Sequence, residues 1–93
     1  MSRFYITTAI DYVNAKPHVG HALEKVLADT IARFHRLSGK ETFFLTGSDE
    51  NSLKNVQAAE KAGVRTKEFV DAIVLDWKGL RSVLNLSFDE FIR

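Results

Sequence analysis

Two histidines, His18 and His21, stand three positions apart in the stretch Asn14-Ala15-Lys16-Pro17-His18-Val19-Gly20-His21. The pattern that follows predicts a helix, so both imidazoles should project toward one side of its first turn. The free N–H groups and the dipole at a helix start favour an anion, and imidazole can donate hydrogen bonds to phosphate. Gly20 lacks a Cβ, so a flat ring can lie against the backbone there. We therefore predict a phosphate-handling corner, against the alternative that both histidines are polar surface residues.

A metal site at this pair is the weaker interpretation. Zinc needs a third ligand and usually a glutamate base at a defined spacing. His35 follows on the same predicted helix, but about four turns away, too far to join the pair. The sequence has no cysteine, which excludes a thiolate zinc site within these residues. We interpret His35 as a structural residue near the helix end.

The elements that must position the histidines follow a strand–helix–strand pattern. Residues 4–8 are rich in aromatic and β-branched side chains and predict a buried strand. Residues 9–16 lack a clean period, and Pro17 favours a helix start close to itself, with Asn14 or Lys16 near the cap. Gly39 is a natural stop for this helix. Residues 41–46 are near-continuously apolar, which is typical of a parallel-sheet strand.

The first helix has one apolar stripe at spacings of three and four residues, and two strands alone would give this long apolar helix too little to cover it. Its members are Val19, Leu23, Val26, Leu27, Ile31 and Phe34. The charged residues of this helix fall largely off that stripe: Glu24, Lys25, Asp29, Arg33 and Arg36.

Two further helices are expected after a polar loop at 47–52. One spans 53–62, with Ser52 as cap and Gly63 as stop, and the next begins with Thr66 as cap. Aromatic and apolar residues at helical spacing in the latter are interpreted as core: Phe69, Ile73 and Trp77. Lysines are interpreted as solvated: Lys54, Lys61, Lys67 and Lys78. Residues 88–92 form either a short strand or an extended exit.

A right-handed crossover makes the two strands parallel, so the loops that follow them lie at one carboxyl edge of the sheet. Ligands bind at that edge in open α/β sheets. Tyr12, His18, His21 and Asp49 should therefore converge. Asp49 or Glu50 could hold a substrate ammonium group, although an ordinary solvated loop explains them equally well. Two strands do not make a stable sheet, so further strands are expected outside these residues.

Composition sets the remaining limits. With 93 residues and a net charge of +1, the chain is at most one small domain without an electrostatic footprint for nucleic acid. No stretch resembles a signal peptide or a membrane-spanning segment, so a cytoplasmic protein is the expectation.

The motif and its flanks resemble a known family. Pro17-His18-Val19-Gly20-His21 resembles the HIGH signature of class I aminoacyl-tRNA synthetases. The stretches 4–14, 28–39, 43–50 and 88–93 resemble, in order, the first strand and loop, the next helix, the second strand and loop, and the segment before the connective insertion of methionyl-tRNA synthetases. The resemblance covers essentially the whole chain. It implies an α/β fold, namely the first, incomplete βαβ portion of a Rossmann-like (HUP-type) parallel-sheet nucleotide-binding domain.

The resemblance also implies a chemistry. Methionine would attack the α-phosphate of ATP, bound with Mg²⁺, and the methionyl group would pass to tRNA(Met). His18 and His21 would contact the ATP phosphates, and Gly20 would let adenine stack closely. Asp49 would bind the methionine ammonium group, and Ile10 and Tyr12 would line the methionine pocket.

Some family features are changed or missing. Asn51 and Ser52 replace a usual His-Gly pair, and Asp11 stands where proline or tyrosine is common. The zinc-binding knuckle, the Lys-Met-Ser-Lys-Ser loop and the anticodon-binding domain are not in these residues; zinc is expected only in a downstream part. We therefore expect residues 1–93 to be a single, truncated N-terminal part of the catalytic domain, inactive alone.

Two other interpretations stay open at this point. One is a small nucleotidyltransferase with a similar His-x-x-His corner, transferring an adenylyl group to a phosphorylated acceptor. The other is a non-catalytic nucleotide-binding or interaction module.

Overall fold

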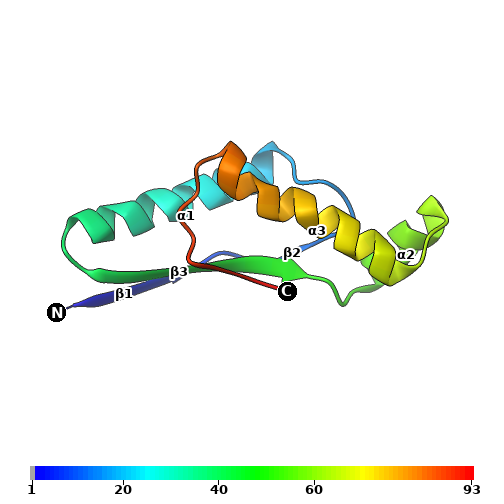
Figure 1. Cartoon of the computed structure of the whole chain (residues 1–93), viewed down its shortest axis with the longest axis horizontal. Coiled ribbons are helices and arrows are strands. Elements are labelled where there is room, and N and C mark those ends of the chain that lie inside the picture. Colours follow the sequence, from blue (N-terminus) through cyan, green and yellow to red (C-terminus); the bar gives the residue numbers. More distant parts are fainter. Residues whose placement is uncertain (1) are drawn as a thin grey trace.

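The structure, a computed structural model, describes residues 2–93. All three helices lie on one side of a sheet (Figure 1). The elements in chain order are β1 (Arg3–Thr7), β2 (Asp11–Tyr12), α1 (Val19–Leu37), β3 (Glu41–Asp49), α2 (Leu53–Ala62), α3 (Thr66–Val83) and β4 (Glu90–Ile92). None of the helices described is both long enough and apolar enough to cross a lipid bilayer.

The sheet is parallel throughout and is built around β3. β1 pairs with the first half of β3, β2 with its last two residues, and β4 with its middle. The register slips by one residue between β1 and β2, because Thr7 pairs with Leu45 whereas Asp11 pairs with Ser48. The extra residue is a local bulge that re-aims the chain at the carboxyl edge of the sheet. The expected parallel βαβ fold is confirmed.

The carboxyl edge is more ordered than the sequence predicted. The segment 9–16 contains β2, and β3 continues to Asp49 instead of ending near residue 46. Polar residues Ser48 and Asp49 extend the strand because β2 supplies backbone partners for them. The segment 88–92, ambiguous in sequence, ends in the short strand β4. Close approach of β4 requires Gly47, since a Cβ there would lie 2.3 Å from the Ile92 carbonyl oxygen.

Helix boundaries match the prediction best where a cap residue was recognised. α2 spans the predicted residues: the Ser52 side chain accepts a hydrogen bond from the Asn55 N–H, and Gly63 ends the helix with φ +73°. α1 ends at Leu37, just before Gly39, which also has a positive φ. For α3 the prediction is wrong by one position: the N-cap is Arg65, without a side-chain cap bond, and Thr66 is the first helical residue.

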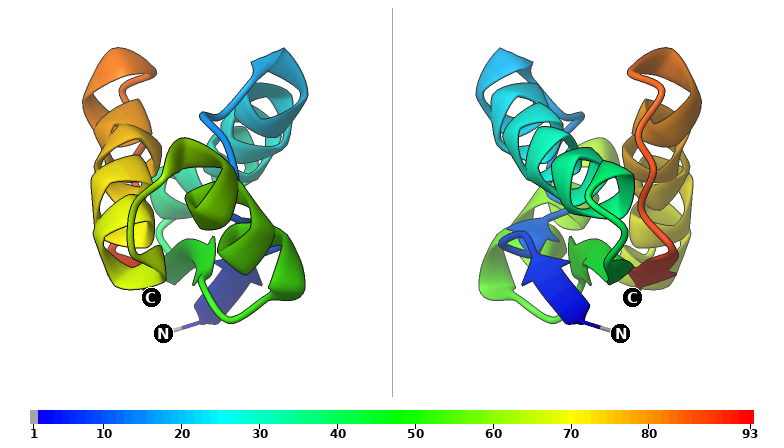
Figure 2. Two further views of the ribbon diagram at one scale, coloured as in Figure 1. Left: turned by 90° about the vertical axis from the view of Figure 1, so that its right-hand side faces the viewer. Right: turned by 90° about the vertical axis from the view of Figure 1, so that its left-hand side faces the viewer.

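The core consists of two neighbouring clusters beneath α1 and α3, which diverge above the sheet (Figure 2). The first joins α1, β3 and the segment before β4 through Ala28, Ala32, Phe44, Leu86 and Phe88. The second joins α3 to the segment after β2 through Val13, Val70, Val74 and Trp77, with Phe69 and Ile73 against it. The assignment of Phe69, Ile73 and Trp77 to the core is confirmed.

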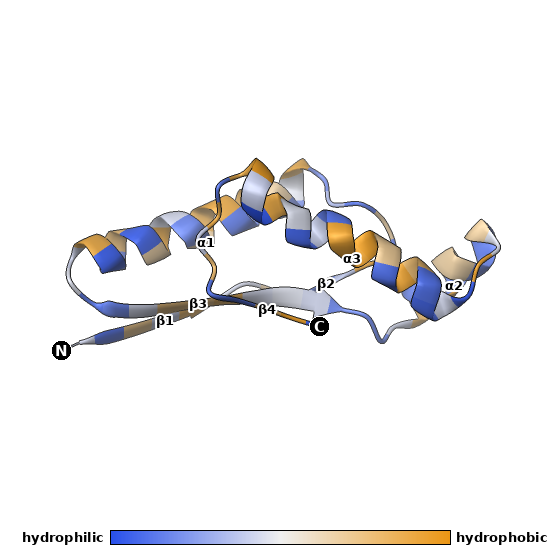
Figure 3. Ribbon diagram, in the orientation of Figure 1, coloured by the Kyte–Doolittle hydropathy of each residue, from blue (hydrophilic) through white to orange (hydrophobic). Residues whose placement is uncertain are grey.

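The apolar stripe of α1 is not the face that packs on this sheet. Orange, hydrophobic positions recur along α1 (Figure 3), and those of the stripe are largely exposed, from Val26 at 39% to Val19 at 85%. The buried residues of α1 are Lys25, Ala28, Asp29 and Ala32. Small alanines let the helix approach the sheet closely, and the two charged residues are buried because each has ionic partners. The stripe has no partner within the residues described.

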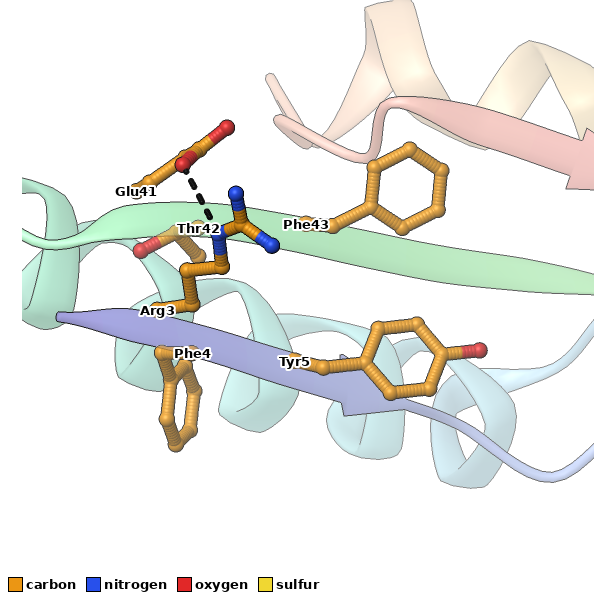
Figure 4. Close-up of a pocket in the computed structure, with 6 residues that line it drawn as sticks. All are labelled: Arg3, Phe4, Tyr5, Glu41, Thr42 and Phe43. Carbon is orange, nitrogen blue, oxygen red and sulfur yellow. Dashed lines mark hydrogen bonds and ion pairs between the residues drawn. The ribbon is translucent and has the colours of Figure 1, made fainter.

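The opposite face of the sheet is also uncovered. Phe4 stacks on His35 of α1, so the alternation along β1 turns Tyr5 to the other face. There Tyr5 stacks beside Phe43 of β3, and both rings are more than 40% exposed (Figure 4). The radius of gyration is 14.9 Å, against about 12 Å for a compact domain of this length. Within the residues described, two apolar faces are therefore uncovered, the stripe of α1 and the face of the sheet that carries Tyr5 and Phe43.

Candidate active site

A pocket of about 330 Å³ lies at the carboxyl edge of the sheet, beside the start of α1. Its walls come from the segment between β2 and α1, from α1 itself and from α2 and α3. The lining residues are Asp11, Tyr12, Asn14, Ala15, Lys16, His18, His21, Lys54 and Trp77. The structure thus brings together Tyr12, His18 and His21, as the sequence predicted.

His18 is the N-cap of α1, whereas the sequence suggested Asn14 or Lys16. Its backbone is extended, and its Nδ1 accepts a hydrogen bond from the Gly20 N–H at 3.0 Å. Imidazole is an unusual cap, so residue preferences alone point to the wrong position. One of the free N–H groups at this helix start is therefore already satisfied by a side chain of the site.

His21 completes a reciprocal capping arrangement. Its Nδ1 accepts the backbone N–H of His18 at 3.1 Å, and the two imidazole rings stack with centroids 3.8 Å apart. A nitrogen that accepts a backbone N–H carries no proton, so the proton of each neutral ring is on Nε2. Both histidines therefore hold an Nε2–H group that can donate to an anion in the pocket.

Gly20 is required by the ring of His18. A Cβ at Gly20 would lie 2.9 Å from Cε1 and 3.2 Å from Nδ1 of that ring. The flat ring that lies against Gly20 in this structure is thus the imidazole itself. Stacking of another ring on Gly20 requires His18 to turn away from the helix end.

A buried cation fixes the segment that leads into the site. Lys25, one turn after His21, is almost wholly buried, and its Nζ lies 2.7 Å from Asp11 Oδ2 and 2.8 Å from Glu24 Oε1. The same ammonium group donates to the Ala9 carbonyl at 3.4 Å. These contacts tie the bulge between β1 and β2 to α1 and neutralise the charge that Asp11 brings to the pocket wall.

Asp49 is placed by backbone pairing and by α2. It pairs in register with Tyr12, and its Oδ1 accepts the Asn51 N–H at 3.2 Å. Asn55, fully buried in α2, donates its side-chain amide to the Asp49 carbonyl at 3.0 Å. Asp49 therefore lies beside Tyr12, although it is not among the residues that line the pocket.

Other predicted residues lie farther from the pocket. Ile10 is 52% exposed at the bulge and does not line the pocket. Arg93 donates hydrogen bonds to Glu50 and to Asp71, and both carboxylates raise its pKa. Hydrogen bonds from Lys67 and Arg93 lower the pKa of Asp71. His35 is structural, as expected, because its ring stacks on Phe4 with centroids 3.6 Å apart. Partial burial and the nearby Lys40 charge lower its pKa.

The sequence reasoning missed three contributors to the site: Lys25, Lys54 and Trp77. Lys54 is exposed, as predicted, and in addition its Nζ lies 5.8 Å from the centre of the Tyr12 ring and it lines the pocket. Lys25 stands four positions after His21, on the same side of the helix, and that spacing was an available signal. No local pattern could have revealed Trp77, because its partners are about 60 residues earlier in the chain.

Comparison with known proteins identifies the family. Residues 4–93 match the family model described as "tRNA synthetases class I (M)". The chain therefore belongs to this family of class I tRNA synthetases. It is 49% identical over 92 residues to a methionine–tRNA ligase of Rhizobium meliloti, and 50% identical over 93 residues to one of Mycobacterium leprae. The chain spans less than a fifth of these relatives, 18% and 17% of their lengths.

The fold agrees with a solved structure. Mycobacterium tuberculosis methionyl-tRNA synthetase, solved in complex with methionyl-adenylate, superposes on the whole chain with a TM-score of 0.98 and 49% identity. The match covers 18% of that protein. The expected Rossmann-like nucleotide-binding fold is thereby confirmed, and the match argues against a small nucleotidyltransferase.

Proposed function

We propose that the chain supplies the phosphate-binding corner of a methionine–tRNA ligase, as the N-terminal part of its catalytic domain. The observation that carries this proposal is the pair of Nε2–H donors on His18 and His21 at the pocket beside the start of α1. The relative solved with methionyl-adenylate supports methionine and ATP as substrates.

The proposed reaction joins methionine to ATP, which enters as its Mg²⁺ complex. A carboxylate oxygen of methionine forms a bond to the α-phosphorus, and the bond from that phosphorus to the bridging oxygen breaks, releasing pyrophosphate. The attacking carboxylate is already ionised, so no general base is needed. Catalysis is then positioning plus charge stabilisation.

The histidines are the residues suited to this task. The Nε2–H groups of His18 and His21 would donate to phosphate oxygens, most strongly when negative charge builds up at the pentacoordinate phosphorus. Gly20 would let adenine stack on the helix start once His18 has turned. Until His18 turns, the two cap bonds fix the orientation of both rings.

The amino-acid side of the site follows from the neighbouring strands. Asp49 would bind the methionine ammonium group. Tyr12 from the pocket and Ile10 from outside it would together line the space for the methionine side chain. The methionyl group would then pass to the terminal adenosine of tRNA(Met). We place this activity in the cytoplasm, where the tRNA is charged.

The test is amino-acid-dependent exchange of pyrophosphate into ATP, measured with the full-length protein. Methionine should support exchange at least about 100-fold better than leucine, valine or isoleucine. The isolated 93-residue chain should show none, because two apolar faces that complete the fold are bare. Pyrophosphate exchange that does not depend on methionine would contradict the proposal, and so would adenylyl transfer to a phosphorylated acceptor.

A further inference from the structure

Trp77 connects α3 to the motif that lies about 60 residues earlier. It is the only tryptophan of the chain and is 2% exposed. Its Nε1–H donates to the Ala15 carbonyl at 3.1 Å. Ala15 lies in the segment between β2 and α1, which has no regular structure of its own, so this bond fixes the backbone just before the two histidines.

The same indole contacts the second histidine. The rings of Trp77 and His21 meet edge to face, with centroids 4.7 Å apart and an angle of 62° between their planes. His21 is also stacked on His18 and bonded at Nδ1. Its imidazole is thus held by three groups, which together set the direction of Nε2.

α3 also supports the segment through a purely apolar contact. Val13 is fully buried and packs in the cluster with Val70, Val74 and Trp77. Val74 shares this packing, but it makes neither the hydrogen bond to Ala15 nor the ring contact with His21. The contribution of Trp77 to the site can therefore be separated from its contribution to the core.

We propose that Trp77 is a positioning residue for His21 and for the segment leading to it. The inference rests on the proposed function, in which His21 acts on the transition state. Because Trp77 contacts the His21 ring edge to face and fixes the Ala15 carbonyl by a hydrogen bond, its loss should lower kcat by misaligning Nε2, while substrate binding changes little.

The first test compares variants of the full-length protein in pyrophosphate exchange. Trp77→Leu should lower kcat about 10-fold or more, with each KM changed less than about 3-fold. Trp77→Phe keeps a ring near His21 and loses only the donor, so its kcat should fall about 2- to 5-fold. Val74→Ala, the matched control from the same cluster, should lower the melting temperature with kcat within about 2-fold. An equal loss of kcat in Val74→Ala, or unchanged kcat in both tryptophan variants, overturns the proposal.

The second test asks whether Trp77 acts through His21. In a His21→Ala background the tryptophan substitutions should change the residual rate by less than about 2-fold, because the group they position is gone. If the tryptophan substitutions lower the residual rate of His21→Ala by the same factor as they lower the rate of the unmodified protein, the inference is overturned, even if His21→Ala itself supports the proposed function.

A spectroscopic readout does not depend on activity. The His21 ring signal in the proton NMR spectrum, identified by its absence from His21→Ala, should move in Trp77→Leu and stay in place in Val74→Ala. If the His21 signal does not move in Trp77→Leu, the proposal is overturned, whatever reaction the protein catalyses.

Discussion

Lys25 and Asp11 form an ion pair at 2.7 Å in which the lysine side chain is 3% exposed and the aspartate side chain 19%. This pair joins the first helix to the strand bulge beside the pocket. A buried charge left without its partner is strongly destabilising, whereas removal of both charges costs far less.

Lys25→Met should therefore lower the free energy of unfolding by about 3 kcal/mol. Asp11→Asn in the same chain should restore part of that loss, because the uncompensated carboxylate is removed. Lys67→Met, which breaks an exposed pair with Asp71, is the control and should cost at most about 1 kcal/mol. Urea unfolding of the full-length proteins measures all three, and equal losses for Lys25→Met and Lys67→Met would contradict a buried role.

Gly20→Ala should displace the His18 ring, since the new Cβ would lie 2.9 Å from Cε1. We expect pyrophosphate exchange to fall about 10-fold or more when the Nε2 donor is misplaced. Gly79→Ala is the control: nothing lies within 4 Å of its Cβ position in α3. That change should stabilise the protein by about 0.5–1 kcal/mol and leave the rate unchanged. A normal rate in Gly20→Ala would rule out the steric argument.

His18→Asn separates the cap from the chemistry. Asparagine is among the best N-cap residues, so the free energy of unfolding should change by less than about 0.5 kcal/mol. The exchange rate should nevertheless fall about 100-fold, because the amide cannot place a donor where Nε2 was. His18→Ala should lose both properties, with about 1 kcal/mol of stability lost with the cap. An active His18→Asn variant would show that His18 is only a cap.

Asp29 should contribute to the acid sensitivity of the fold. Burial raises its pKa, but hydrogen bonds from Ser87 and Arg33 outweigh burial and hold the pKa below its ordinary value. A lowered pKa means that the stabilisation is complete above the unfolded value, about pH 4, and is lost as the pH falls through the folded value.

Asp29→Asn should thus lower the free energy of unfolding by about 1.5–3 kcal/mol at pH 7. The difference in this free energy between the variant and the unmodified protein should become smaller below about pH 4. Asp76→Asn, an exposed aspartate of α3, serves as the control and should cost little at any pH. Urea unfolding between about pH 3 and pH 7 gives both curves. If the difference in free energy of unfolding stays constant down to about pH 3, Asp29 does not contribute to the acid sensitivity of the fold.

The sequence predicted the elements but not all of their contacts. Gly39, Gly63 and Ser52 marked helix ends correctly, because a left-handed residue or a hydroxyl cap acts locally. The prediction that Tyr12, His18, His21 and Asp49 converge followed from topology alone. The first three line one pocket, whereas Asp49 lies beside Tyr12 without lining it. The exposure of the α1 stripe agrees with the expectation that two strands give this helix too little cover, but a periodic pattern does not show which segment covers an apolar face.

For the candidate site too, the sequence predicted which residues lie at the helix start but not all of their contacts. The spacing of His18 and His21 predicted that both rings lie at the helix start. It did not predict that their Nδ1 atoms accept backbone N–H groups, because those hydrogen bonds depend on the folded backbone. Buried Lys25 was placed with the exposed charges, since its partner Asp11 is 14 positions earlier. The contact from Trp77 to Ala15 spans 62 positions, and no pattern within either segment encodes it.

The most direct measurement of the central claim is single-turnover formation of methionyl-adenylate by the full-length protein and by its His21→Ala variant. If the histidine donors stabilise the transition state, the variant should form the adenylate about 100-fold more slowly, while its dissociation constant for methionine stays within about 3-fold. Adenylate formation at the unmodified rate in His21→Ala would contradict the account.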